Sequence, residues 1–273
     1  MSMEDWLAKS KHGEDFVRQG YCVVPIQGEQ RASLDRARAL LVAGLRAALP
    51  GGDGLGDEDY LNRFHKFSNA ATLNDVRVRI HRELGGSPEY RKLVFNCVKN
   101  YLFDLVGNEV VMQRNVNPVT HLPRDKTQLL YLHTDAWSGC SPYEVILWMP
   151  LVDVYDTKSM YLCKRDPNNK HMRDLKAGAQ VDSAVELLKK IRPDIAPVKM
   201  KYGEALLFSP TLMHGAEENL TDETRFILNV RFKSLFSPYG TKALGETFLP
   251  VNYLPATEIG LSYESEFGIV DGG

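Results

Sequence analysis

Apolar positions recur at helical spacing in the first third of the chain. In residues 29–49, apolar side chains repeat every three or four positions, a spacing that predicts a helix with one buried stripe. Residues 71–84 predict a second helix with the same kind of pattern. A third is expected over 87–107, because Ser87 suits the N-cap position and Pro88 suits the first helical position.

Beyond this region the pattern changes to short segments rich in β-branched and aromatic residues, separated by turn residues. The predicted strands lie within 109–116, 128–135, 143–154, 158–163, 196–202, 204–210 and 225–234. One helix, over 182–191, interrupts them. Helices followed by a block of strands favour an α+β chain built around a β-sandwich or barrel. A parallel α/β fold would need strands and helices to alternate throughout, and here they do not.

The length of 273 residues with 44% hydrophobic content suits a single domain spanning 1–273. We expect a mainly helical part over 1–107, a β-rich core over 108–240 and a C-terminal tail over 241–273. The polar, charged stretch within 156–197 is typical of a lid that orders over a binding site.

Charge and cysteine content exclude several classes of function. The chain has 33 basic and 35 acidic residues, a net charge of −2, so no electrostatic grip on nucleic acid or on an anionic membrane is expected. No apolar run approaches a membrane span, and the N-terminus lacks the apolar region of a signal peptide. The four cysteines are far apart and form no CxxC pair, which indicates reduced thiols and a cytoplasmic protein. Oligomeric state is not indicated.

The stretch LLYLHTDAWSG, residues 129–139, places a histidine and an aspartate inside an apolar run. Side chains two residues apart in a strand point to the same face, so His133 and Asp135 can share one metal ion. The same pair would also suit an ordinary buried hydrogen bond.

A third ligand is expected from His214, which follows the predicted strand over 204–210. Gly215 comes next and lets the backbone approach other groups closely. Two imidazoles and one carboxylate form the facial triad of non-heme iron(II) oxygenases, although the ligand types alone also permit zinc. Of the other histidines, His121 and His171 lie in polar stretches where solvated loops are expected.

The segment 225–234 alternates between apolar and mixed positions. The apolar face is formed by Phe226, Leu228, Val230 and Phe232, and the other face by Arg225, Ile227, Asn229 and Arg231. If the second face lines a lumen, Arg225 can bind a carboxylate through its rigid fork. It lies eleven residues after His214, a position suited to the far carboxylate of 2-oxoglutarate, whose 2-oxo acid end would chelate iron. An edge strand with solvated charges is the competing interpretation.

Three segments together resemble the phytanoyl-CoA dioxygenase-like iron(II)/2-oxoglutarate oxygenases. They are FVRQGYCVVPI (16–26), HTD (133–135) and YGEALLFSPTLMHGAEENLTDETR (202–225). The chain departs from the family pattern at Glu204, where aspartate is commoner, but that position supports a turn. The stretch 133–162 also resembles members encoded in aminoglycoside (streptomycin-type) and surface-carbohydrate gene clusters.

The resemblance implies a double-stranded β-helix (jelly-roll, cupin-like) core flanked by the N-terminal helices. It implies that His133, Asp135 and His214 bind Fe(II), and that Arg225 pairs with the C5 carboxylate of 2-oxoglutarate. O2 would be the cosubstrate, and succinate and carbon dioxide would be released. The expected reaction is oxidation of a C–H bond, usually hydroxylation, in a small molecule such as a sugar, aminocyclitol or nucleotide-sugar derivative. Cyclisation, desaturation and epimerisation remain open. In related halogenases a small residue replaces the carboxylate, so Asp135 argues against halogenation.

Further site residues are predicted from their position alone, and packing or solvation would explain several of them equally well. Those expected to contact the cosubstrate are Tyr131 and Gln113. Those expected to contact substrate are Trp137, Ser138, Asn115, Asn229 and Arg231, the last suited to an anionic group or to a salt bridge.

Other classes of protein are weighed against this one. A catalytically inactive jelly-roll protein that binds sugars or acts as a scaffold would keep the fold, but such relatives often lose a ligand. A cupin-like metalloenzyme independent of 2-oxoglutarate commonly has HxH and a following glutamate, a pattern not found here, and would leave Arg225 without a purpose. A zinc hydrolase has no supporting HExxH motif.

Overall fold

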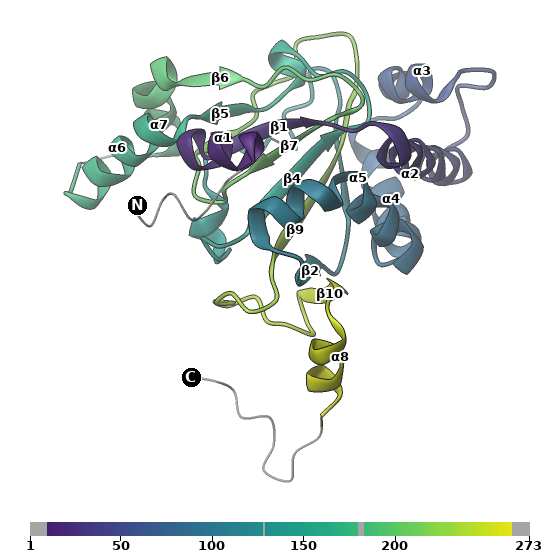
Figure 1. The fold of residues 1–273 in the computed structure, drawn as a ribbon. Helices are drawn as coiled ribbons and strands as arrows, with labels where there is room; N and C mark the ends of the chain where they lie inside the picture. The colour runs from purple at the N-terminus through teal and green to yellow at the C-terminus, as the bar shows by residue number, and fades with distance from the viewer. Residues whose placement is uncertain (1–9, 128, 180–182, 264–273) are drawn as a thin grey trace, which may run out of the picture.

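The computed structural model describes residues 10–127, 129–179 and 183–263. Within them, two antiparallel sheets face each other, and helices cover the outer face of the larger sheet (Figure 1). This arrangement confirms the predicted α+β class, with helices first and strands afterwards.

The larger sheet has seven strands in the described part of the chain, in the order β1-β7-β4-β9-β2-β10, with β3 also paired to β9. Its strands are β1 (Tyr21–Pro25), β2 (Val110–Gln113), β3 (Asn117–His121), β4 (Val145–Pro150), β7 (Glu204–Phe208), β9 (Arg225–Ser234) and β10 (Phe248–Asn252). The smaller sheet, in the order β6-β5-β8, consists of β5 (Tyr161–Cys163), β6 (Ile195–Pro197) and β8 (His214–Gly215).

The helices are distributed along the chain and include short 3-10 turns and one π-helical turn. The α-helices are α1 (Lys11–Gln19), α2 (Gly28–Ala48), α3 (Asp57–Asn62), α4 (Ala70–Ile80), α5 (Pro88–Val106), α6 (Arg165–Lys176), α7 (Ala184–Ile191) and α8 (Pro255–Ser262). The short turns are η2 (Phe64–Lys66), η3 (His81–Gly85, π), η4 (Asp135–Ser138), η5 (Asp156–Lys158) and η6 (Arg192–Asp194).

The alternation along β9 separates two apolar clusters. Phe226 and Leu228 pack against α2, α4 and α5 in the main core, whereas Ile227 joins the cluster between the two sheets. Because successive strand residues point to opposite faces, Arg225, Asn229 and Arg231 also face the space between the sheets. The two-faced pattern expected for 225–234 is therefore confirmed.

The predicted helices are confirmed as α2, α4 and α5, and the helix over 182–191 as α7. Ser87 caps α5 by accepting a hydrogen bond from the Tyr90 amide, as its position suggested. All four cysteines are free and buried. Among the described residues, no helix is long and apolar enough to cross a bilayer.

The strand expected over 128–135 is wrong for residues 129–134, which form no ladder. Only His133 pairs, in an isolated antiparallel bridge with His214. An apolar run becomes a strand only where another strand completes its hydrogen bonds, and residues 129–134 have no ladder partner among the described residues. The metal ligands are therefore placed by a bridge and a 3-10 turn.

Two other expectations need correction. The lid expected over 156–197 cannot include β5, because β5 is the middle strand of the smaller sheet and its Leu162 pairs with His214. For the rest of the segment the lid stays a prediction. The tail expected over 241–273 includes β10, which pairs with β2 and extends the larger sheet. Local composition did not show these pairings with distant strands, which decided the outcome. The final stretch, 264–273, lies outside the described residues.

Replacing Phe248 with alanine should destabilise the protein by about 3–5 kcal/mol, the usual cost of removing a fully buried phenylalanine. Ile259→Ala, in the exposed α8, should change the free energy of unfolding by less than about 0.5 kcal/mol. Urea unfolding measures both. Equal, small effects would contradict the integration of β10 into the sheet.

Candidate metal centre

The bridge between His133 and His214 brings together two segments that are far apart in sequence. The His133 amide donates to the His214 carbonyl at 3.0 Å, and the His214 amide donates to the His133 carbonyl at 2.9 Å. Asp135 follows at the start of η4, where the Thr134 side chain accepts a hydrogen bond from the Trp137 amide. The local backbone thus holds the carboxylate next to both imidazoles.

The three side chains converge on one point. The Oδ1 atom of Asp135 lies 3.5 Å from Nε2 of His133 and 3.9 Å from Nε2 of His214. One ligand atom from each residue lies within 4.8 Å of the other two. Two imidazole nitrogens and one carboxylate oxygen suit a divalent transition metal and leave its other positions open.

Backbone carbonyls set the tautomer of both histidines. Nδ1 of His133 lies 2.7 Å from the Tyr131 carbonyl, and Nδ1 of His214 lies 2.9 Å from the Leu212 carbonyl. A carbonyl only accepts, so each Nδ1 carries the proton and each Nε2 keeps its lone pair for a metal. Burial, followed by the proximity of His133, lowers the pKa of His214 to about 4, so this ring is neutral at physiological pH.

Asp135 is buried and has one cationic partner. Its Oδ2 atom accepts a hydrogen bond from Nη2 of Arg231, which leaves Oδ1 toward the histidines. Burial alone would raise the pKa of Asp135, but the neighbouring His133 imidazole and the charge of Arg231 outweigh it and lower the pKa. The carboxylate is therefore ionised and oriented, as a monodentate metal ligand needs to be.

Gly215, the residue after His214, allows two chain segments to pass close to each other. A β-carbon at Gly215 would collide with the Tyr161 hydroxyl and would lie 3.0 Å from the carbonyl carbon of Tyr131. The position thus needs a residue without a side chain for β8 to pass next to the His133 segment. This explains the HG pair in the sequence.

The triad shares one cavity of about 130 Å³ with the inward face of β9. Arg225 lines this cavity and is only 6% exposed. Its Nη1 donates to the Ser159 carbonyl at 2.9 Å, while its Nε has no partner in the described structure. Among the described residues no carboxylate pairs with Arg225, and burial lowers its pKa to about 10. A buried guanidinium without a counter-ion is a ready site for an anionic ligand.

The remaining predicted residues lie in different places. Asn229 lines the cavity, and its buried Oδ1 has no partner in the described structure. Gln113 accepts a hydrogen bond from Arg231 at 3.3 Å. Asn115 lies between β2 and β3, next to Gly86 and outside the cavity wall. Arg231 donates to Asp135, so it forms the salt bridge that was the alternative to binding an anionic group.

Tyr131, Trp137 and Ser138 are exposed and flank the metal ligands along the chain, but none lines the cavity. The parity argument for Tyr131 and Trp137 depended on a regular strand, which the structure does not contain. Their contacts with cosubstrate or substrate stay predictions.

Sequence reasoning misplaced two histidines. His121 is 2% exposed on β3, opposite Arg225, and burial followed by the charge of Arg225 lowers its pKa to about 4. His171 pairs with Asp194 at 2.7 Å. Sequence reasoning also missed the ion pair between Lys158, which is fully buried, and Glu223, which lies two residues before Arg225. No local pattern marks either residue.

Comparison with known families supports the sequence resemblance. The family model described as phytanoyl-CoA dioxygenase (PhyH) matches residues 162–227, a segment that contains His214 and Arg225. The resemblance is therefore confirmed for that part of the chain. A search of curated protein sequences gives no match.

Several solved structures are similar over most of the chain. A nickel complex of the non-heme monooxygenase ThoJ has a TM-score of 0.56 at 17% identity, covering 89% of this chain and 84% of that one. The non-heme alpha-ketoglutarate-dependent carbocyclase SnoK from nogalamycin biosynthesis has a TM-score of 0.55 at 17% identity, covering 90% and 97%. EctD from S. alaskensis, with 2-oxoglutarate and 5-hydroxyectoine, has a TM-score of 0.54 at 17% identity, covering 88% and 80%. The fold is thus the double-stranded β-helix of the non-heme oxygenases.

Replacing Asp135 with asparagine should weaken divalent metal binding by at least about 100-fold, because residues that only support ligands already contribute up to this much. It should also cost about 3 kcal/mol of stability, because it leaves Arg231 buried and unpaired. Calorimetric titration with Fe(II) or Mn(II) and urea unfolding measure the two effects.

The double variant Asp135→Asn/Arg231→Gln separates the ligand from the ion pair. It should regain most of the lost stability, since no charge is left unpaired, but not the metal affinity. Recovery of metal binding in the double variant would contradict the assignment of Asp135 as a ligand.

Proposed function

We propose that this protein is an Fe(II)- and 2-oxoglutarate-dependent dioxygenase that oxidises a C–H bond of a small molecule. One observation carries the proposal. A triad of two imidazoles and a carboxylate shares a cavity with Arg225, a buried arginine that has no carboxylate partner among the described residues. An inactive jelly-roll protein would have no need to maintain both features.

The residues present suit the proposed cofactors. His133, Asp135 and His214 would hold Fe(II) through Nε2, Oδ1 and Nε2, the atoms that already converge. Arg225 would pair with the C5 carboxylate of 2-oxoglutarate, whose other end chelates the metal. When bound, iron with 2-oxoglutarate and O2 supplies the oxidant for the C–H bond, with release of succinate and carbon dioxide. The similar structures include the alpha-ketoglutarate-dependent carbocyclase SnoK and EctD with 2-oxoglutarate, which supports this proposal.

The protein's own contribution is to place and protect the reacting groups. Arg231 keeps Asp135 ionised and directs one of its oxygens to the metal position. The cavity wall also includes the apolar side chains of Trp148, Met160 and Ile227, which limit the contact of the charged groups with water. Retention of the Asp135 carboxylate favours oxygen chemistry over halogenation, which in related enzymes needs that position vacated.

Hydroxylation of a sugar, aminocyclitol or nucleotide-sugar derivative is the proposed reaction. Trp137 and Tyr131 are 49% and 51% exposed beside the metal ligands, where aromatic faces can stack on the C–H faces of a sugar ring. The sequence resemblance to members from aminoglycoside and carbohydrate gene clusters supports this substrate class. The buried free cysteines are consistent with the proposed cytoplasmic location.

Succinate release on incubation with Fe(II), ascorbate, 2-oxoglutarate and candidate sugars tests the function. Replacing Arg225 with glutamine should raise the KM for 2-oxoglutarate at least about 30-fold, because the loss of a buried charged partner costs about 2 kcal/mol or more. Asn229→Ala, on the same face of β9, is the matched control and should leave this KM within about threefold. An unchanged KM in the Arg225 variant would overturn the assigned role of this residue.

A further inference from the structure

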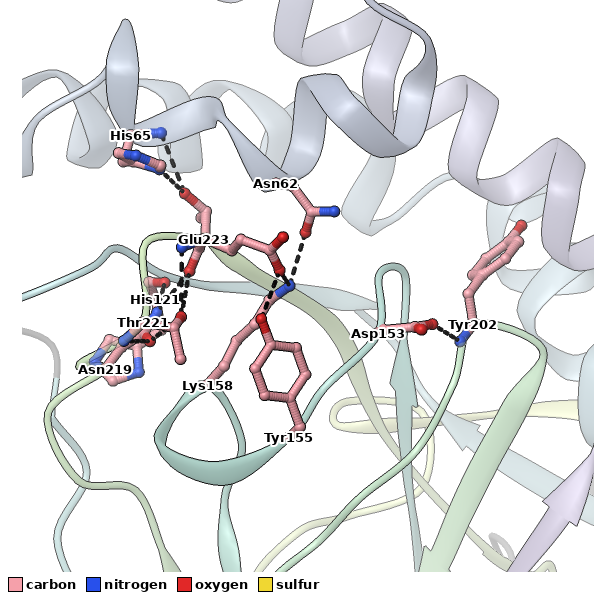
Figure 2. Close-up of polar contacts among 11 residues, drawn as sticks. Asn62, His65, His121, Asp153, Tyr155, Lys158, Tyr202, Asn219, Thr221 and Glu223 are labelled. Atoms are coloured by element: carbon pink, nitrogen blue, oxygen red, sulfur yellow. Dashed lines mark hydrogen bonds and ion pairs between the residues drawn. The ribbon is translucent and has the colours of Figure 1, made fainter.

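An ion pair with one fully buried member lies just before β9 and outside the lining of the cavity. The Lys158 side chain is fully buried, and its Nζ lies 2.6 Å from Oε2 of Glu223 and 2.7 Å from Oδ1 of Asn62. The Tyr155 hydroxyl donates to the same Glu223 oxygen at 3.0 Å. Figure 2 shows these four side chains meeting below the turn that carries Asn62 and His65.

The pair is costly to build, which indicates that its geometry is tightly held. Burial of the Lys158 ammonium lowers its pKa, and the hydrogen bond and charge of Glu223 counteract the shift. A buried ammonium persists only where partners satisfy it, so the two oxygen atoms that accept from it, Oε2 of Glu223 and Oδ1 of Asn62, cannot easily move away.

The ion pair joins the two chain segments that define the position of Arg225. Lys158 immediately precedes Ser159, whose carbonyl accepts the hydrogen bond from Arg225 Nη1 at 2.9 Å. Glu223 lies two residues before Arg225, and Arg225 is the first residue of β9. The guanidinium and its backbone acceptor are therefore tied to each other through Lys158 and Glu223.

Further contacts fix the same segment from the helical side. The Thr224 hydroxyl lies 3.1 Å from both the amide and Nδ1 of His65. Asn219 donates through Nδ2 to the Glu223 carbonyl at 2.8 Å. His65, Asn219 and Glu223 are labelled in Figure 2. The residues immediately before Arg225 are thus held on several sides, and Lys158 lies fully buried at the centre of these contacts.

We propose that Lys158 is a positioning residue for the cosubstrate: through Glu223 and the Ser159 backbone, it holds Arg225 where the far carboxylate of 2-oxoglutarate binds. The proposal rests on the proposed function. A two-pronged guanidinium–carboxylate contact depends on orientation. A displacement of about 1 Å in a positioned group costs on the order of 100-fold in reaction rate. The role of Lys158 therefore concerns only ligands long enough to reach Arg225.

The test compares two ligands that share one end. 2-Oxoglutarate and 2-oxobutyrate both chelate metal through a 2-oxo acid, but only the first has a carboxylate for Arg225. Each is titrated anaerobically into the Fe(II)-loaded protein, and the visible absorption band of the chelate reports binding. In Lys158→Met, the Kd for 2-oxoglutarate should rise about 10- to 100-fold. The Kd for 2-oxobutyrate should stay within about twofold, and the position of the band should not change.

Two further variants keep the result interpretable. Lys170→Met removes an exposed lysine that pairs with Asp174 on α6, and should alter neither titration. Glu223→Gln is the milder change, because the Glu223 side chain is 40% exposed. This variant should raise the Kd for 2-oxoglutarate, as Lys158→Met does, and leave the Kd for 2-oxobutyrate unchanged. It serves in place of Lys158→Met if circular dichroism shows that the latter does not fold.

The outcomes separate this proposal from the function on which it rests. If Lys158→Met weakens the binding of both ligands equally, or of neither, the positioning role is overturned and the proposed function still stands. Absence of the band with either ligand in the wild-type protein overturns the function, and the positioning role with it.

Discussion

The pair of backbone hydrogen bonds between His133 and His214 is the interaction on which the whole site depends. It is an isolated bridge outside any strand ladder, flanked by single backbone hydrogen bonds from Ala216 to Leu130 and from Ala136 to Pro210. Its support comes from β5, which pairs with β8, and from Gly215, which permits the close approach. Because both imidazoles also donate through Nδ1 to nearby carbonyls, one local arrangement sets their distance, orientation and tautomer.

Strand β9 supplies both cations of the cavity, and only one of them has an acidic partner among the described residues. Arg231 pairs with Asp135 without any ligand, so it forms part of the candidate metal centre. Arg225, on the same face of the strand, has only a carbonyl partner among the described residues. A buried charge of this kind costs free energy when it has no counter-charge, which supports the proposed role of Arg225 in binding an anionic ligand. The period of two in the strand is what aligns both groups on one wall.

The helices and the larger sheet provide the rigidity that this arrangement requires. The apolar face of β9 packs on α2, α4 and α5, while the polar face turns to the cavity. Contacts from Asn62 and His65, at the end of α3 and in η2, reach the start of β9. The helical part therefore covers the sheet and also anchors the segment that precedes Arg225.

The helices α2, α4 and α5, the two faces of β9 and the choice of His133, Asp135 and His214 follow from the sequence, because side-chain periodicity and ligand chemistry are local properties. The tertiary structure alone decided the rest. It replaced the strand at 129–134 by a bridge, buried His121, drew Arg231 to Asp135 and enclosed Lys158 with Glu223. Each of these depends on which distant segments meet, since burial and pairing of a charge are set by partners remote in the chain and not by the residues beside it.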